Sequence, residues 1–307
     1  MAPVHIQKLH TLTGHRDCVY TLQDADQGGI FFSGSGDGMV VKWDPGQSEE
    51  GERIAQLPNS IYALDYLKDR DLLVVGHNYE GIHLLNWKNK TEVGSLKLSA
   101  AAIFDIQSFN QNCFVACGDG TVTVVDLQSL LIRKQLKFSE KNARTIAINP
   151  VLGEMAVGYS DNFIRIFSLE DFTLKHEWAG HTNSVFTLSY TPDFKFLLSG
   201  SRDARLKAWD AEANYALHKE VAAHLYAINH IACSPDGKHF VTCSMDKSVK
   251  VWQTADLTLL KVVDKARHAG HGTSVNKLLW SSYNDQVVSA SDDRTISIWD
   301  VILNYKH

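Results

Sequence analysis

The chain has 307 residues and a formal net charge of −5, an acidic balance that argues against general nucleic-acid binding because such binding favours a basic face. No run of 18 apolar residues occurs that could cross a membrane as a helix, and the first eight residues lack the apolar stretch of a signal peptide. We therefore expect a cytoplasmic protein with reduced cysteines, none at zinc-ribbon spacing: Cys18, Cys113, Cys117, Cys233 and Cys243.

The first predicted element is a strand over residues 4–12. Val4, Ile6, Leu9 and Leu12 provide its apolar positions. At the other end of the chain only eight residues follow Trp299, too few for a turn and a full strand. We therefore expect residues 4–12 to supply the outermost strand of the last repeat and so to join the two ends of the chain.

The next predicted elements are four short apolar runs, at residues 18–22, 30–33, 39–43 and 53–57. Turn sequences such as Gly-Asp-Gly separate them, and none has a helical period, so they predict four antiparallel strands. A single four-stranded sheet cannot bury both of its faces. The pattern therefore requires neighbouring copies of the same unit.

A polar signature accompanies this pattern and recurs in four places. A His is followed 22 residues later by an Asp and six residues after that by a Trp, and a hydroxyl side chain stands four residues before the Asp. The four sets are His15, Ser33, Asp37 and Trp43; His181, Ser199, Asp203 and Trp209; His224, Thr242, Asp246 and Trp252; and His271, Ser289, Asp293 and Trp299. Four residue types in one register indicate a repeat architecture.

Three further repeats lie between Trp43 and His181, where the hydrophobic register continues without the His. The Trp position holds Trp87, Val125 and Phe167, and the Asp position holds Gly81, Asp119 and Asp161. More apolar packing could compensate for the lost hydrogen bonds, or a bound partner could support this sector. The seven predicted repeats are 12–57, 58–96, 97–136, 137–178, 179–221, 222–262 and 263–307.

The residues that open and close these repeats resemble the WD-repeat family. Gly-His precedes the first strand at 14–15, 180–181 and 270–271, and Trp-Asp closes the third strand at 43–44, 209–210 and 299–300. The resemblance covers essentially the whole chain, strongly in repeats one, five, six and seven. It implies an all-β, seven-bladed propeller in a single domain, residues 1–307, that acts as a platform for macromolecular partners, usually without chemistry of its own.

We interpret the recurring polar residues as structural tetrads. Asp can accept a hydrogen bond from the imidazole, the imidazole can meet the hydroxyl, and the hydroxyl can meet the indole N–H. The same residue types could form a Ser-His-Asp triad, but nucleophilic catalysis needs one exposed constellation in a cleft. Four identical copies, each with a Trp, argue against it, so we predict no catalytic residues.

A candidate binding rim emerges when equivalent positions are compared. One position lies five residues after each tetrad His, where the innermost strand begins, and its counterpart can be read in the repeats without the His. The series is Tyr20, Tyr62, Phe104, Arg144, Phe186, Asn229 and Asn276. The residue before each Asp position should point to the same face and includes Glu80, Arg202, Met245 and Asp292. Aromatic and Arg side chains are enriched in interface hot spots, which favours a docking surface for protein segments. Alternatively, the aromatics only pack between blades.

The leading hypothesis is therefore a non-catalytic scaffold for protein partners in a multi-protein assembly, without cofactor, metal, membrane or small-molecule substrate. A metal-dependent propeller enzyme would need channel-facing ligands, for which Asp65, Asp105 and His230 are the only candidates. Recognition of nucleic acid or of a modified peptide would use a local basic patch, for which Arg144, Arg202 and Arg205 are the best candidates.

Overall fold

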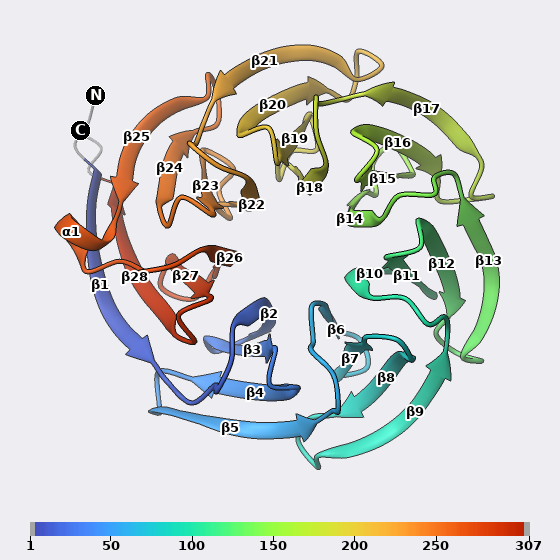
Figure 1. Ribbon diagram of the computed structural model, residues 1–307, viewed down its shortest axis with the longest axis horizontal. Coiled ribbons are helices and arrows are strands. Elements are labelled where there is room, and N and C mark those ends of the chain that lie inside the picture. Colours follow the sequence, from blue (N-terminus) through green and yellow to red (C-terminus); the bar gives the residue numbers. More distant parts are fainter. Residues whose placement is uncertain (1–3, 304–307) are drawn as a thin grey trace.

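The structure is a computed structural model that describes residues 4–303, and it confirms the predicted all-β architecture. Its 28 strands form seven four-stranded sheets, in each of which neighbouring strands are antiparallel. Viewed along the shortest axis of the molecule, the sheets are arranged as blades around a centre (Figure 1). The chain visits the blades in order, and within a blade it runs from the innermost strand to the outermost.

The first four blades have the following bounds. Blade 1 comprises β2 (Val19–Gln27), β3 (Ile30–Ser35), β4 (Met39–Asp44) and β5 (Ser48–Gln56). Blade 2 comprises β6 (Leu64–Leu67), β7 (Leu72–His77), β8 (Gly81–Asn86) and β9 (Thr91–Lys97). Blade 3 comprises β10 (Ile103–Phe109), β11 (Asn112–Cys117), β12 (Thr121–Asp126) and β13 (Leu131–Lys137). Blade 4 comprises β14 (Ala143–Asn149), β15 (Glu154–Tyr159), β16 (Phe163–Ser168) and β17 (Leu174–Ala179).

The remaining blades continue the pattern. Blade 5 comprises β18 (Val185–Tyr190), β19 (Phe196–Ser201), β20 (Arg205–Asp210) and β21 (Ala216–Ala222). Blade 6 comprises β22 (Ile228–Cys233), β23 (His239–Ser244), β24 (Val249–Gln253) and β25 (Thr258–Val263). Blade 7 comprises β26 (Val275–Trp280), β27 (Gln286–Ser291), β28 (Ile296–Leu303) and the N-terminal strand β1 (Val4–Leu12).

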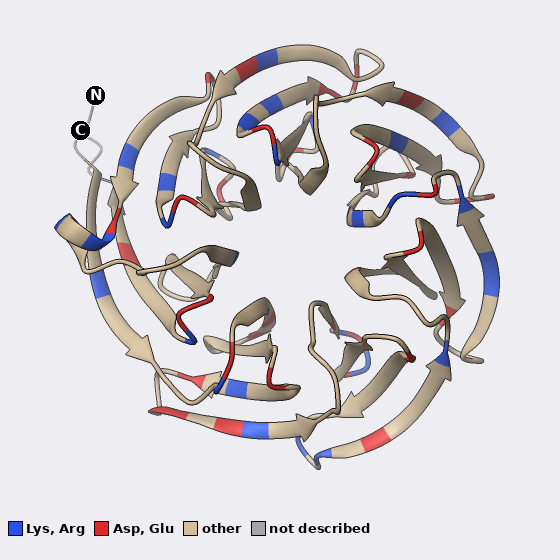
Figure 2. Ribbon diagram, viewed as in Figure 1, with Lys and Arg blue, Asp and Glu red and all other residues tan. Residues whose placement is uncertain are grey.

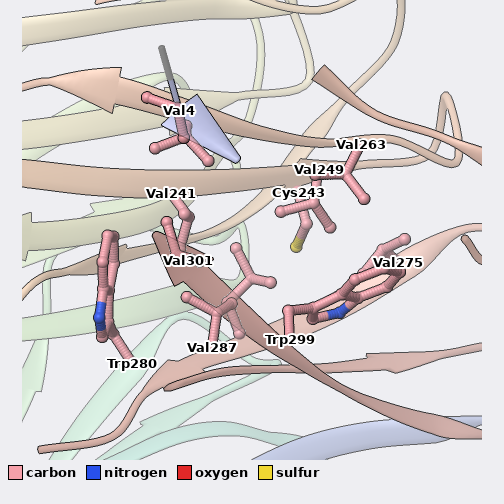
Figure 3. Close-up of a cluster of buried hydrophobic side chains, with 12 residues drawn as sticks. Val4, Val241, Cys243, Val249, Val263, Val275, Trp280, Val287, Trp299 and Val301 are labelled. Atoms are coloured by element: carbon pink, nitrogen blue, oxygen red, sulfur yellow. The ribbon is translucent and has the colours of Figure 1, made fainter. Parts of the chain in front are cut away.

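Strand β1 closes the ring, as predicted. It pairs antiparallel with β28, from Val4 opposite Leu303 to Leu12 opposite Ile296 (Figure 1). Val4 also joins a buried cluster with residues of blades 6 and 7, including Val241, Val287 and Val301 (Figure 3). The first strand of the chain therefore supplies both backbone pairing and apolar packing to its last blade.

The core lies between neighbouring blades. Phe114 of β11 and Phe167 of β16, for example, are fully buried in one cluster that joins blades 3 and 4. The innermost strands consist largely of apolar and amide side chains, and Arg144 and Lys277 are their only basic residues. Lys and Arg otherwise gather on the outer strands and loops (Figure 2). A repeat scaffold of this kind is stabilised by contacts between neighbours.

Two local features differ from the sequence prediction. The outermost strand of blade 1 starts at Ser48 rather than at residue 53. The sequence pattern does not reveal this start, because the first six residues of the strand are exposed and show no alternation of apolar and polar side chains. A one-turn helix, α1 (Lys265–His268), connects blades 6 and 7. Asp264 caps it by accepting the backbone N–H of Arg267 at 2.8 Å.

Candidate functional site

The four His/hydroxyl/Asp/Trp sets form hydrogen-bonded tetrads inside their blades. In blade 1, His15 Nδ1 lies 3.1 Å from Asp37 Oδ2 and His15 Nε2 lies 2.7 Å from Ser33 Oγ, while Trp43 Nε1 donates to the same Oγ at 2.8 Å. In blades 5, 6 and 7 the corresponding distances are 2.9–3.0 Å, 2.7–2.9 Å and 2.8 Å. The hydroxyl accepts from the indole, so its own proton is donated to the imidazole.

The electrostatics of the tetrads match this assignment. Burial lowers the pKa of His15 and of His224, which favours the neutral imidazole that can accept from the hydroxyl. Burial alone would raise the pKa of Asp203, but the hydrogen bond and charge of His181 lower it instead. The four hydroxyl side chains are fully buried, so their oxygens are closed off from solvent. The tetrads therefore stabilise their blades.

Blade 2 replaces the tetrad with a different relay. The strand register puts Val75 at the hydroxyl position and Leu85 at the Trp position, so the sequence assignment of Trp87 and Gly81 in this repeat is wrong by two residues. His77 stands where blade 1 has Ser35, and Asn59 Nδ2 lies 3.4 Å from His77 Nε2. His77 Nδ1 lies 3.1 Å from His83 Nε2, and His83 Nδ1 lies 2.8 Å from Glu92 Oε2. Glu92 is exposed. This relay therefore ends at the molecular surface rather than in the turn that a tetrad Asp stabilises.

Apolar side chains replace the tetrad in blades 3 and 4. Val115 and Val157 occupy the hydroxyl positions and are fully buried, as are Val125 and Phe167 at the Trp positions. Asp119 and Asp161 have a structural role without the tetrad. Each accepts the backbone N–H two residues further on, at 2.9 and 3.1 Å, and so stabilises the turn. In these two blades apolar packing therefore occupies the places of the missing tetrad side chains.

The seven residues at the start of the innermost strands surround one cavity. Its volume is about 290 Å³. Each blade contributes one half-buried side chain to its lining: Tyr20, Tyr62, Phe104, Arg144, Phe186, Asn229 and Asn276. The structure thus brings together all the residues that the sequence comparison places at this position. No carboxylate or imidazole lines the cavity, so it lacks the usual protein ligands of a metal ion.

Five of these side chains form a continuous chain of ring contacts. The rings of Tyr20 and Tyr62 meet edge to face at 4.8 Å between centroids, and those of Tyr62 and Phe104 stack at 5.9 Å. The guanidinium carbon of Arg144 lies 4.3 Å from the Phe104 centroid and 4.5 Å from the Phe186 centroid. Cation–π attraction therefore positions Arg144 between two phenyl rings of adjacent blades.

The Arg144 guanidinium has no hydrogen-bond or ion-pair partner among residues 4–303. Burial lowers the pKa of Arg144; the nearby Tyr62 hydroxyl opposes this shift, and the positive charge of Arg202 adds to it. The Tyr62 hydroxyl likewise has no hydrogen-bond partner in the described part of the chain. The cavity therefore contains hydrogen-bond donors that the protein itself does not use.

Asn229 and Asn276 are engaged differently. The amide nitrogen of Asn229 donates to the carbonyl oxygen of Val275 in the next blade at 2.8 Å. The amide nitrogen of Asn276 donates across the ring closure to the carbonyl oxygen of Val19 at 3.0 Å and to Asp292 Oδ1 at 2.7 Å. In blades 6 and 7 this position therefore links adjacent blades.

The second predicted set lies on the same face of the ring. Arg202, Met245 and Asp292 each donate a backbone N–H to the carbonyl two residues before the cavity-lining residue of their own blade, at 2.9–3.1 Å. Arg202 and Met245 are exposed, whereas Asp292 is bonded to Asn276. Glu80 does not occupy this position, because its turn bonds match those of Gly38, two residues further along the turn. Glu80 is exposed, and its carboxylate lies 3.7 Å from Lys97 Nζ. Of the four, Arg202 and Met245 thus offer side chains without a partner inside the described chain.

Sequence reasoning missed two apolar residues of this face, Leu225 and Tyr226, which are 82% and 62% exposed. They follow the tetrad His224 directly. The equivalent pairs in the other complete repeats are Arg16-Asp17, Thr182-Asn183 and Gly272-Thr273. An apolar pair at a position that is otherwise polar or glycine was the signal that could have identified them. Together with Met245 they form an exposed apolar patch on blade 6, hereafter the blade 6 patch.

The candidate metal ligands serve other roles in the channel wall. Asp105 Oδ2 accepts the Ile146 backbone N–H at 2.7 Å, and His230 Nδ1 accepts the Leu278 backbone N–H at 3.3 Å. Both bonds join adjacent blades. Asp65 Oδ2 is buried without a hydrogen-bond partner, and burial raises the pKa of Asp65 to about 6. Within residues 4–303 no three His, Cys, Asp or Glu side chains are grouped so as to hold a metal ion.

Comparison with known proteins agrees with this architecture. Residues 6–44, 172–210, 216–253 and 264–300 match the family model described as WD domain, G-beta repeat. These four stretches contain the four complete tetrads. The chain therefore belongs to the WD-repeat family. Among solved structures, the WD40 β-propeller domain of Doa1 superposes with a TM-score of 0.85 at 17% identity, covering 96% of this chain and 97% of that one.

Two curated relatives match over most of this chain. Protein groucho of Drosophila melanogaster is 25% identical over 230 residues, which are 70% of this chain and 31% of the relative. Transducin-like enhancer protein 2 of Mus musculus is 25% identical over 217 residues, 67% of this chain and 28% of the relative. The chain thus spans less than a third of the length of these relatives. No helix among residues 4–303 is long and apolar enough to cross a membrane.

Proposed function

We propose that this protein is a non-catalytic scaffold that binds extended segments of partner proteins at the rim where its innermost strands begin. The observation that carries the proposal is the cavity of about 290 Å³ to which every blade contributes one side chain. Four of those side chains are aromatic and one is Arg. These residue types dominate interface hot spots because they bury a large area and still offer a polar group.

The rest of this face supports the same function. The blade 6 patch exposes Leu225, Tyr226 and Met245 beside the turn that leads to Asn229. The rim is part of a closed ring of hydrogen-bonded blades, so little conformational entropy is lost by the scaffold when a segment docks. A cytoplasmic location and membership of a multi-protein assembly belong to this proposal as well.

Recognition of nucleic acid has less support. Of its three candidate residues, Arg205 already pairs with Glu220 at 3.2 Å and lies on strand β20 rather than on the rim. Arg144 is enclosed by two phenyl rings, which leaves Arg202 as the exposed cation of the set. One exposed Arg is far fewer than the several phosphate contacts that drive nucleic-acid binding.

Site-specific photo-crosslinking tests the proposal. A benzophenone amino acid is placed at Tyr62 or at Tyr226 on the proposed rim, and at Val151 as the control. Val151 is 73% exposed in the hairpin between β14 and β15, at the far end of strand β14 from Arg144. Irradiation in native lysate should link the same partner segments to both rim positions and none to position 151.

A triple variant separates docking from packing. Tyr62→Ala, Phe104→Ala and Phe186→Ala together remove three of the five ring-contact residues. If they only pack, the thermal midpoint should fall sharply while crosslinking through position 226 continues. That result, or crosslinking at position 151 alone, would refute the proposed function. Loss of crosslinking in a variant that still unfolds cooperatively would support it.

A further inference from the structure

We propose that the cavity receives an acidic side chain, Asp or Glu, from the partner segment, and that Arg144 is the cation with which this side chain pairs. This inference rests on the proposed function, because it requires a protein segment to dock at the rim. It specifies the chemistry of that segment at one position.

The first argument compares Arg144 with Arg165, which lies in the same blade. Both guanidinium groups contact two aromatic rings: Arg165 lies 4.7 Å from the Tyr159 centroid and 5.0 Å from the Phe163 centroid. Arg165 also pairs with Asp161 at 2.9 Å and with Glu177 at 3.1 Å. Arg165 therefore shows that a structural arginine in this protein has carboxylate ion pairs in addition to its aromatic contacts.

Arg144 has the aromatic contacts of Arg165 but lacks the carboxylates. Charged groups removed from water are normally paired, because the lost hydration is not otherwise replaced. No carboxylate lies within ion-pair distance of Arg144 in the part of the chain that the structure describes. The missing counter-ion can arrive with a ligand, since Arg144 lines the cavity.

The second argument is the donor pattern of the cavity. Arg144 has five N–H donors and no acceptor, and a carboxylate offers two oxygens that fit the guanidinium fork. The Tyr62 hydroxyl, also without a partner, can donate to the same ligand. Asn229 and Asn276 already direct their amide nitrogens to other blades. The free donors therefore come from blades 2 and 4, on the side of the cavity opposite the two bonded Asn side chains.

The third argument concerns charge and surroundings. Among the seven residues that line the cavity Arg144 alone is charged, so one carboxylate is sufficient to neutralise the lining. The blade 6 patch on the same face provides apolar contacts for the residues that flank the acidic one. A carboxylate on a protein segment fits these features better than a free anion, which would leave the patch uncovered.

The test uses a displayed library of random 12-residue peptides selected on the full-length protein. Selected peptides are then synthesised with amidated C-termini, and their affinities for the protein and its variants are measured by calorimetry. The proposal expects one position in the selected peptides to be consistently Asp or Glu. Changing that residue to Asn or Gln should weaken binding about tenfold or more, because a charge-assisted pair is lost.

Protein variants complete a double-mutant cycle. Arg144→Met keeps the apolar stem between the two rings and should weaken the acidic peptide about tenfold or more, while leaving the amide peptide nearly unchanged. Arg205→Met, which removes an exposed arginine outside the rim, is the matched control and should alter neither affinity substantially. Because the Arg144 guanidinium has no hydrogen-bond or ion-pair partner in residues 4–303 and the Met side chain keeps the contact with both rings, Arg144→Met should retain or raise the thermal midpoint. A merely structural cation–π contact predicts a lower midpoint.

The outcomes distinguish this inference from the proposed function. Peptides that need Tyr62 and Phe104 but show no acidic preference would overturn the inference and leave the proposed function standing. Binding that requires a free C-terminal carboxylate or a phosphorylated residue would also overturn it. Failure to select any peptide that depends on the rim would refute the proposed function and this inference together.

Discussion

Single polar side chains in the channel wall link neighbouring blades. In four blades the residue after the cavity-lining residue accepts a backbone N–H of the next blade; Thr145 Oγ1 accepts from Leu188 N and Thr187 Oγ1 accepts from Ile231 N, both at 3.2 Å. Asp105 and His230 occupy the same position and accept in the same way. In these four blades Thr, Asp and His therefore share one role as an acceptor between blades, and catalytic chemistry is not needed to explain them.

Asp65 is a buried carboxyl group whose Oδ2 has no hydrogen-bond partner, and it yields a pH-dependent prediction. Burial raises its pKa from an ordinary 3.8 to about 6, so the folded chain binds a proton more tightly than the unfolded chain. Asp65 therefore stabilises the fold least above pH 6, and its contribution improves as the pH falls toward 4. Since one pKa unit corresponds to about 1.4 kcal/mol, the full difference is about 3 kcal/mol.

Urea unfolding of an Asp65→Asn variant at several pH values checks this prediction. The stability of the variant relative to the unchanged protein should be greatest near pH 7.5 and should decline toward pH 4. Asp69→Asn, in the exposed turn that follows, controls for the loss of one charge. A difference between Asp65→Asn and the unchanged protein that does not vary with pH would contradict the assignment.

At the scale of strands, apolar periodicity predicts the inner three strands of a blade far better than the outermost one. Strand β5 is exposed at seven of its nine positions and β13 at six of its seven, so no alternating pattern marks their bounds. Strand β1 was predictable because both of its ends are buried in blade 7. Helix α1 was not, since one turn contains no complete hydrophobic period and no residue of it is buried.

Strand β1 should be essential for cooperative unfolding. Leu12 is 1% exposed in the cluster that joins blades 7 and 1, and the strand pairs with β28 along its length. Leu12→Ala should therefore cost about 2–5 kcal/mol, and deletion of residues 4–12 should broaden the transition because blade 7 loses its outer strand. Calorimetric unfolding measures both effects.

A synthetic peptide of residues 4–12 provides the control for the deletion. Added in excess, it should restore the sharper transition, whereas a peptide of the same composition in scrambled order should not. If the deleted protein unfolds at the same temperature and with the same sharpness as the full chain, β1 does not hold the ring closed.

At the scale of the whole molecule, the repeat register was the most informative property of the sequence. It predicted the blade number, the ring closure and the residues around the cavity, because equivalent positions in a repeat occupy equivalent places around the axis. It could not predict the contacts that make those residues unequal. That Arg144 lies between two phenyl rings without a counter-ion, whereas Asn229 bonds to the next blade, depends on side-chain geometry across blade boundaries.

The same register exposes the three blades without tetrads, and hydrogen exchange can show whether they need a partner. Val115, Val125, Val157 and Phe167 are fully buried, so the second strands of blades 3 and 4 have as complete a core as those of blades 5 and 6. In the free protein, amides of β11 and β15 should exchange as slowly as those of β19 and β23, because opening any of them exposes a comparable apolar core.

Blade 2 serves as the internal comparison. Its relay passes through His83 to the exposed Glu92, so water reaches one end of it, and β7 should exchange faster than β11. Fast exchange throughout blades 2 to 4 that slows only when a rim-binding peptide is added would show instead that the ligand stabilises this sector. Such coupling would be expected if occupancy of the cavity, which Tyr62, Phe104 and Arg144 line, tightened the three blades that carry them.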